Sequence, residues 1–139
     1  MHRLPKKLTK EFSYNKQEKL KSRKQLDALF KKGKSFTAFP LKVFFAFADD
    51  MQDNIIKTGV GVSSRHFKKA VHRNRVKRLL REAYRTEKLS LHEALGQRNK
   101  KLAVFLLYID KTLPEYILLK EKMQLCIQRL IHEVDIKNT

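Results

Sequence analysis

The stretch that decides the fold is residues 70–85, AVHRNRVKRLLREAYR, in which apolar side chains recur at a helical period. Side chains at i, i+3, i+4, i+7 and i+8 share one helix face, and such an apolar face is stable only when it is buried. The pattern therefore predicts a long helix from about residue 69 to 88. The side chains predicted to dock on a sheet are Val76, Leu79, Leu80, Ala83 and Tyr84.

The other side of this predicted helix is strongly basic. Nine of the 21 residues from 65 to 85 are Lys or Arg, and Glu82 is the only acid. Successive helical residues are rotated by about 100°, so angles counted from Val76 show which side chains point away from the sheet. The residues near the opposite pole are Asn74, Arg78, Arg81 and Arg85, flanked by Arg75 and Lys77. Arg73 falls near the border of the apolar side.

The signs of these charges favour an anionic ligand. Solvated helix faces usually mix signs, with acids placed four residues from bases. Only Arg78 and Glu82 offer such a pair here, so the stacked cations cost stability unless an anion neutralises them. Arg outnumbers Lys on the helix, and the planar guanidinium suits bidentate phosphate contact and stacking on bases. The face therefore indicates RNA or DNA binding.

The rest of the chain supplies a sheet and further helices. Periodicity predicts a first helix over 23–32 and a final helix after Pro114. Residues 41–47 and 56–62 alternate as strands do and are predicted to pair as an antiparallel hairpin, whereas 102–109 is apolar throughout and indicates a buried strand. Residues 96–101 are expected to form a basic loop. The chain is therefore predicted to be an α+β protein: a single-domain α/β sandwich with one small mixed sheet of about four strands packed with helices, in the order α-β-β-α-β-α.

Composition indicates one domain with a basic extension. Residues 1–21 are rich in Lys without a sustained period and are expected to be largely flexible, whereas 22–136 form the RNA-binding domain. The chain has 32 Lys and Arg against 14 Asp and Glu, and nucleic acid is the commonest partner for a net charge of +18. No apolar run approaches the roughly 18–20 residues that cross a bilayer. The lone cysteine, Cys126, is predicted to pack in the core and fits a reducing cytoplasm.

The sequence offers no constellation for a protein-based nuclease. Asp49, Asp50 and Asp53 cluster in a predicted turn, without a His or Glu partner at a recognisable spacing. A two-metal nuclease needs several convergent acids. His66 and His72 do not share a helix face and have no thiol partners, so they are not expected to bind a metal. We therefore expect no catalytic residue and no metal site on this chain.

The block from Ala70 to Arg85 resembles the signature of the bacterial ribonuclease P protein family, an Ala-Val-x-Arg-Asn-Arg-x-Lys-Arg core followed by Arg-Glu-Ala. The flanks agree in order: a Leu-Lys-Ser start and Gly end over 20–33, a Gly-Val-Ser at 61–63, and an apolar strand after the helix. The resemblance covers about residues 14–134. Residues 64–69 depart from it, because the Gly that many members carry before the helix is absent and the loop is one residue longer.

The resemblance implies a subunit of the ribonuclease P holoenzyme, an endoribonuclease that removes the 5′ leader of precursor tRNA. In that family the RNA subunit performs the hydrolysis with Mg²⁺, and the protein binds the catalytic RNA and precursor tRNA, with no small-molecule substrate. Its basic helix and adjoining loop contact the catalytic RNA. The matching positions here are Arg73, Asn74, Arg75, Lys77, Arg78 and Arg81, and the nearby charges add Arg65, Lys68, Lys69 and Arg85.

The resemblance also implies a cleft for the leader between the first helix and the sheet, lined by Leu26, Phe30 and Phe44. The residues themselves support the strand part. Lys42 and Phe44 share a strand face and place a cation beside a flat ring, and single-stranded RNA binds through phosphate attraction and base stacking. The alternative is that Phe44 only packs beneath the first helix. The core spacing of Leu26 and Phe30 favours a partly structural role.

Two other functions stay open on the sequence alone. A ribosomal or other structural RNA-binding protein without nuclease association would share the size and charge, but it has no reason to carry the ungapped Arg-Asn-Arg block. A DNA-binding helix-turn-helix module needs a short helix just before the basic one. Residues 60–62 occupy that place and indicate a strand.

Overall fold

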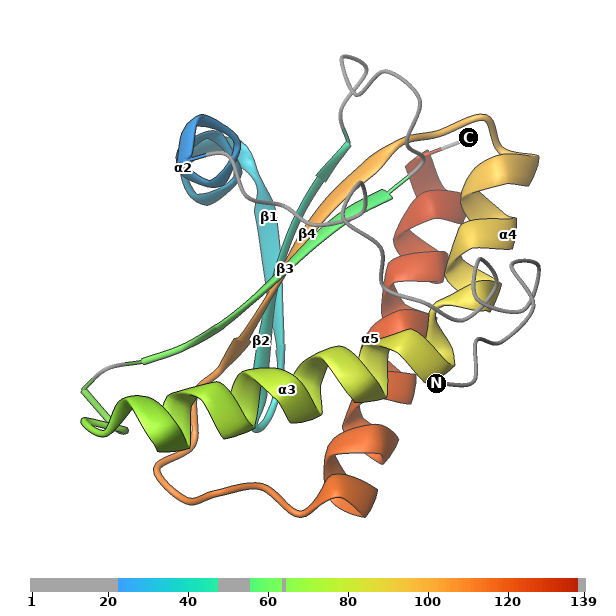
Figure 1. Cartoon of the computed structure of the whole chain (residues 1–139). Helices are drawn as coiled ribbons and strands as arrows, with labels where there is room; N and C mark the ends of the chain where they lie inside the picture. Colours follow the sequence, from blue (N-terminus) through green and yellow to red (C-terminus); the bar gives the residue numbers. More distant parts are fainter. Residues whose placement is uncertain (1–22, 48–55, 64, 138–139) are drawn as a thin grey trace, which may run out of the picture.

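A four-stranded mixed sheet organises the chain, which the computed structural model describes over residues 23–47, 56–63 and 65–137. Helices lie on both faces of this sheet (Figure 1). The elements in chain order are α2 (Arg23–Lys32), β1 (Lys34–Ala38), β2 (Leu41–Phe47), β3 (Ile56–Val62), α3 (Ala70–Glu87), α4 (Leu89–Gln97), β4 (Leu102–Tyr108) and α5 (Tyr116–Lys137). The α+β class, the mixed sheet of four strands and the predicted order of elements are confirmed, with β1 and α4 as additions. The predicted extension 1–21 and the predicted turn at Asp49, Asp50 and Asp53 lie outside the described residues.

The strand order is β1-β2-β4-β3, which corrects the predicted hairpin. β2 and β3 do not pair with each other, because β4 lies between them, antiparallel to β2 and parallel to β3. Val104 of β4 stands opposite both Phe45 and Thr58. Alternation in β2 and β3 shows which face each strand buries, but it does not specify the neighbour. β4 is a central strand, and its residues are apolar throughout because both of its faces are covered.

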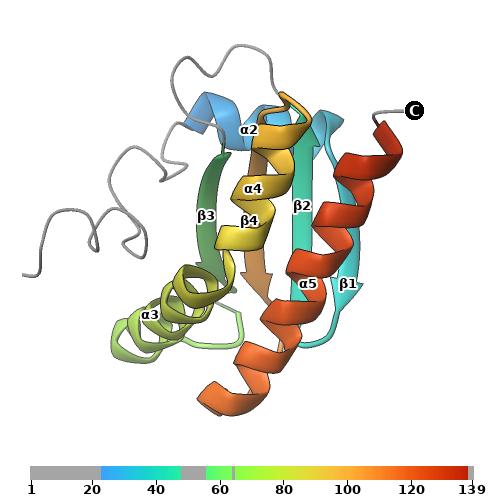
Figure 2. The same cartoon turned by 90° about the vertical axis from the view of Figure 1, so that its right-hand side faces the viewer.

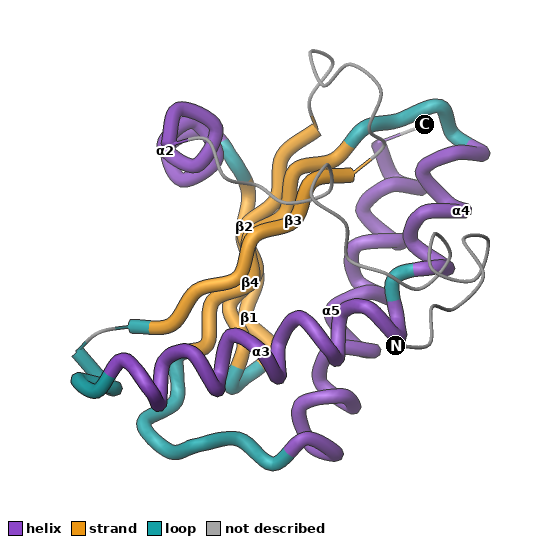
Figure 3. The backbone as a smooth tube through the Cα atoms, in the orientation of Figure 1, coloured by secondary structure: helices purple, strands orange, loops and turns teal. Residues whose placement is uncertain are grey.

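Two elements were not predicted. β1 is an edge strand of five residues that pairs with β2, and much of it is exposed, so its sequence KSFTA carries little apolar signal. α4 extends through Gln97 and buries Leu91 and Leu95 against the core. The predicted basic loop at 96–101 is therefore shorter, because the connection to β4 begins at Arg98. Figure 3 shows this short connection between α4 and β4.

The two faces of the sheet are covered very differently. α3, α4 and α5 pack on one face, where 21 buried residues form the main core (Figure 2). Cys126 is fully buried in this core, as predicted, and burial raises the pKa of its thiol to about 12. Of the described elements, only α2 packs on the second face, around a small cluster centred on Leu29 and Ala103. The second face is thus where the sheet leaves side chains partly open to solvent.

Candidate nucleic-acid interface

α3 is anchored on the sheet by the predicted apolar stripe. Val76, Leu80, Ala83 and Tyr84 are buried, and Leu79 is partly buried against the same core. The Thr58 hydroxyl on β3 donates a 2.8 Å hydrogen bond to the Tyr84 hydroxyl. This anchoring fixes the rotation of α3 about its axis and therefore fixes which residues face solvent.

The solvent-facing side of α3 presents cations without acidic partners. Asn74, Arg75, Arg78 and Arg81 are exposed, and Lys77 is half-buried at the flank. None of the four cations in this group has a side-chain hydrogen bond or ion pair within the described ranges. The first turn of the helix has no acidic residue either, although a helix N-terminus favours negative charge. The surface is therefore suited to a polyanion.

The acids of α3 lie near its C-terminal end and already have partners. Glu82 pairs with Arg85 and not with Arg78 as the spacing suggested, and the Arg85 hydrogen bond lowers the pKa of Glu82. A bidentate guanidinium three residues away competes well with one four residues away. Glu87 lies 3.9 Å from the Lys120 ammonium of α5. Arg85 is partly exposed at the surface, and its guanidinium is paired with Glu82.

Arg73 faces back toward the loop that precedes α3. Its Nη1 donates hydrogen bonds of 2.8 Å to the Phe67 carbonyl and 2.7 Å to the Lys68 carbonyl. The side chain is half-buried, which agrees with its predicted place at the border of the apolar face. Arg73 and Arg75 therefore differ in environment although they flank the same asparagine.

The loop itself carries three exposed cations on an apolar anchor. Phe67 is buried, with its ring centroid 6.1 Å from that of Tyr108, whereas Arg65, Lys68 and Lys69 are exposed. Lys69 is the N-cap of α3 and provides no side-chain hydrogen bond to the helix. The sequence reading missed Phe67 as the anchor, although an aromatic residue isolated among cations was a usable signal.

The second face of the sheet brings together most of the predicted cleft residues. The Phe30 ring of α2 meets the Phe44 ring at 5.0 Å in an edge-to-face arrangement, and the Lys42 ammonium lies 5.2 Å from the centre of Phe44. Phe30 remains 46% exposed. Leu26 packs on the same cluster. The structure therefore places Phe44 beneath α2 and at the same time beside a cation.

Phe105 belongs to this cluster and was missed by the sequence reading. Its ring lies 5.3 Å from that of Phe30. A Cβ at Gly61 on the neighbouring strand would lie 2.5 Å from the same ring, so glycine leaves the space that Phe105 occupies. Phe105 sits in an apolar run whose two faces look alike in sequence, and only the register of β4 against β2 assigns it to the second face.

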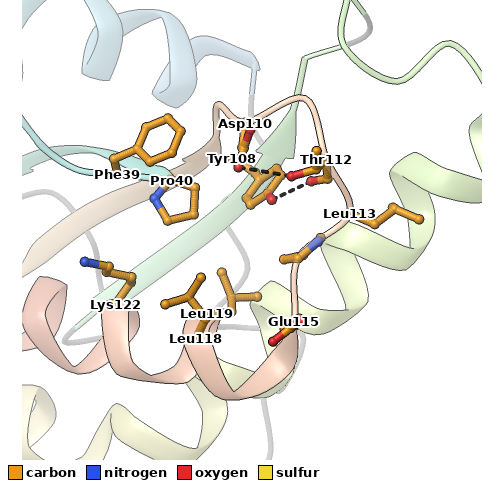
Figure 4. A pocket seen from close by; sticks show the side chains of 11 residues that line it. Phe39, Pro40, Tyr108, Asp110, Thr112, Leu113, Glu115, Leu118, Leu119 and Lys122 are labelled. Carbon is orange, nitrogen blue, oxygen red and sulfur yellow. Dashed lines mark hydrogen bonds between the residues drawn. The ribbon is translucent and has the colours of Figure 1, made fainter.

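A cavity of about 540 Å³ lies elsewhere, between the β1–β2 turn, the β4–α5 connection and the start of α5 (Figure 4). Phe39, Pro40 and Leu118 form apolar walls. The Tyr108 hydroxyl donates a 2.6 Å hydrogen bond to the Thr112 carbonyl, and burial raises the pKa of Tyr108 to about 12. None of the predicted site residues lines this cavity.

Within the ranges that the structure describes, no group of three or more His, Cys, Asp or Glu residues is placed to hold a metal ion. No helix in those ranges is long and apolar enough to cross a membrane.

A small mixed sheet that carries an uncompensated cationic helix defines a class of compact α+β proteins suited to binding polyanions. The family model described as Ribonuclease P matches residues 14–130, and this chain belongs to the ribonuclease P protein family. The ribonuclease P protein component of Porphyromonas gingivalis is 32% identical over 123 residues, which cover 88% of this chain and 90% of the relative. That of Chlorobium phaeobacteroides is 33% identical over 132 residues, with 88% of each chain covered.

Solved structures show the same fold. The ribonuclease P protein from Thermotoga maritima superposes with a TM-score of 0.62 at 24% identity and covers 81% of this chain and 96% of its own. That of Staphylococcus aureus gives a TM-score of 0.59 at 17% identity, covering 82% and 97%. Membership of this family associates the chain with a ribonucleoprotein that processes tRNA.

Proposed function

We propose that this chain is the protein subunit of a cytoplasmic ribonuclease P holoenzyme that removes the 5′ leader of precursor tRNA. The observation that carries the proposal is the exposed side of α3, where Arg75, Arg78 and Arg81 point to solvent without acidic partners among the described residues. In this proposal α3 and the loop before it bind the catalytic RNA. Arg65, Lys68, Lys69 and Lys77 extend the same cationic surface.

Binding at this surface would be driven largely by counterion release. Each phosphate neutralised by Lys or Arg frees condensed cations, so affinity falls steeply with salt. Arg is favoured over Lys for such contacts because its planar fork meets two phosphate oxygens at once. The exposed Asn74 has an amide that can donate to and accept from RNA, which gives a contact that depends on geometry more than on charge.

In this proposal the leader binds on the second face of the sheet. Phe44, Phe30 and Phe105 form a connected aromatic cluster, and Phe30 is partly open to solvent. Lys42 lies beside Phe44 and can meet a phosphate while a base stacks on a ring. Stacking on an aromatic side chain contributes roughly 1–3 kcal/mol per base and tolerates any sequence. These properties suit a single-stranded leader whose sequence varies between precursors.

In the proposed holoenzyme the RNA subunit carries out phosphodiester hydrolysis with Mg²⁺, and no Mg²⁺ site is assigned to this chain. The protein contributes cations that offset repulsion between two RNA molecules. This electrostatic contribution should matter most when Mg²⁺ is scarce, because divalent cations otherwise screen the same repulsion.

A reconstitution tests the proposal. The protein is mixed with a bacterial ribonuclease P RNA and a precursor tRNA at low Mg²⁺, and 5′ leader removal is followed on a gel. We expect faster cleavage at the correct position than with the RNA alone. RNA binding without any stimulation would contradict the proposal and support the structural RNA-binding alternative. Cleavage by the protein in the absence of the RNA subunit would also contradict it.

A further inference from the structure

The first arginine of the Arg-Asn-Arg block is already engaged within the protein. A guanidinium Nη carries two hydrogens, and Nη1 of Arg73 donates to two carbonyls, those of Phe67 and Lys68, at 2.8 and 2.7 Å. Hydrogen bonds from a charged donor are shorter and stronger than neutral ones. The donating capacity of Nη1 is therefore filled by the loop, whereas the exposed Arg75 has no such partner among the described residues.

These two hydrogen bonds fix the backbone at the point where the loop enters α3. Other constraints on the described part of the loop are the buried ring of Phe67 and two groups of Ser63. The Ser63 carbonyl accepts from the amides of His66 and Phe67 at 3.2 Å, and its hydroxyl accepts from the Arg65 amide at 3.2 Å. All of these act before residue 68. Among the described residues, the Arg73 side chain is the constraint that reaches Lys68, two residues before α3 begins at Ala70.

Fixing the two carbonyls also orients the groups that face away from Arg73. In a trans peptide the C=O and the following N–H point in opposite directions. With the carbonyls of Phe67 and Lys68 turned toward Arg73, the amides of Lys68 and Lys69 turn away from it. Both residues are exposed and have cationic side chains. Two consecutive amides beside two ammonium groups form a suitable site for one phosphate.

We infer that Arg73 is a positioning residue that holds Lys68 and Lys69 in place for a phosphate of the catalytic RNA and does not itself bind that RNA. This inference rests on the proposed function, since the phosphate belongs to the RNA that α3 contacts there. It separates two arginines that the sequence motif treats alike.

A double-mutant cycle distinguishes positioning from direct contact, because residues that act through one another have non-additive effects. Arg73→Gln is made in the wild type and in a Lys68→Gln/Lys69→Gln background, and binding to a bacterial ribonuclease P RNA is measured by filter retention over a range of salt. We expect Arg73→Gln to weaken binding about tenfold in the wild type and less than about twofold in the background. The matched control is Arg75→Gln, which should weaken binding by the same factor in both.

Equal losses for Arg73→Gln in both backgrounds would overturn the inference, and so would a further decrease in the salt slope in the background, since that reports a lost phosphate contact. Hydrogen exchange in the free protein gives a second readout. The amides of His66 and Phe67 should exchange faster in Arg73→Gln and remain unchanged in Arg75→Gln, and unchanged exchange in both would contradict positioning. If Arg73→Gln does not fold, Arg73→Lys is taken through the same cycle.

A wild-type protein that fails to bind the RNA would count against the proposed function. Tight wild-type binding with an additive cycle would overturn the positioning role alone.

Discussion

The two longest helices that the structure describes, α3 and α5, both pack an apolar stripe on the same face of the sheet, yet their outer sides differ in charge balance. α3 has six basic and two acidic residues, and its first acid is Glu82. α5 has four basic and three acidic residues, and its charges pair locally, as in Arg129–Glu133 at 3.3 Å and Arg98–Asp135 at 3.3 Å. Lys120 of α5 also pairs with an acid of α3, Glu87.

We interpret this difference as that between a solvated helix and the proposed RNA-binding helix. Surface ion pairs contribute little to stability, typically about 0–1 kcal/mol, so the pairs on α5 do not explain its folding. The ion pairs do, however, neutralise the positive charge of α5. The N-terminal part of α3 lacks that neutralisation, and its cations repel one another at a cost that an anion can remove. A cationic helix is thus informative about function only where acids are missing from its surroundings.

The largest expected effect comes from removing charge from the exposed side of α3. Arg75→Gln/Arg78→Gln/Arg81→Gln should weaken binding to a ribonuclease P RNA by about 100-fold at 0.15 M salt and lower the salt slope by roughly two to three units. The fold should be unaffected or slightly more stable, because like charges have been removed. Filter binding at several salt concentrations and thermal unfolding measure both.

The control removes the same number of charges from α5. Lys120→Gln/Lys122→Gln/Arg129→Gln breaks two surface ion pairs and should change RNA affinity by less than about threefold, since charges beyond the Debye length of about 8 Å are screened. Equal effects of the two triple variants would show that only net charge matters. The contrast between α3 and α5 would then have no functional meaning.

The aromatic cluster on the second face is the other proposed binding surface, and it differs in kind from α3. Phe44→Ala should weaken binding of precursor tRNA to the holoenzyme by roughly tenfold relative to mature tRNA, because a stacking surface for the leader is lost. The salt slope should stay constant, unlike that of the α3 variants. Phe44→Leu retains apolar volume beneath α2 and separates stacking from packing. Equal losses for precursor and mature tRNA would place Phe44 in a structural role.

Sequence patterns predicted the faces of elements better than their neighbours. The buried stripe of α3 and the two sides of β2 follow from local periodicity, which the backbone geometry enforces residue by residue. The pairing of β3 with β4 does not, because it depends on where a distant strand inserts. β1 and α4 escaped prediction because a five-residue edge strand and a nine-residue helix present only two buried apolar side chains or fewer each.

The sequence predicted which charged residues belong to the candidate site, but it did not predict which groups their side chains contact. Charge and motif identified the exposed arginines of α3. They could not show that Arg73 bonds two loop carbonyls or that Arg85 prefers Glu82, because both outcomes depend on side-chain reach in the folded state. Phe105 was equally hidden, since an apolar run does not reveal which of its members faces a ligand.

A smaller effect is expected when α3 is made to resemble α5. Val71 is 74% exposed on the same side as Arg75, one turn earlier. Val71→Glu adds an acid to the first turn and an i,i+4 partner for Arg75, which should stabilise the fold by about 0.3–1 kcal/mol. It should also weaken RNA binding by roughly fivefold, about 1 kcal/mol of repulsion in high dielectric. Urea unfolding and filter binding measure the two changes, with Val71→Gln as the neutral control.

The Val71→Glu experiment is informative because stability and RNA affinity should change in opposite directions. A gain in stability together with a loss of affinity would show that the cations of α3 lower the stability of the fold and raise its affinity for RNA. A loss of both would mean that the acid disturbs the loop, and the comparison with α5 would need another explanation.

An effect of similar size concerns the buried stripe of α5, which should respond to pH and not to RNA. Burial raises the pKa of Cys126 from 9.0 to about 12, so the folded state holds the neutral thiol while the unfolded state ionises. The stability from this group is therefore complete below pH 9 and is lost as pH rises toward 12. Between pH 8 and 10 the wild type should lose about 1 kcal/mol more than Cys126→Ala, as measured by urea unfolding. Tyr108, with its own raised pKa, adds the same alkaline loss to both proteins and cancels in the difference. Parallel curves for the two proteins would show that the thiol is reached by water, and that the inner side of α5 is less tightly packed than its full burial indicates.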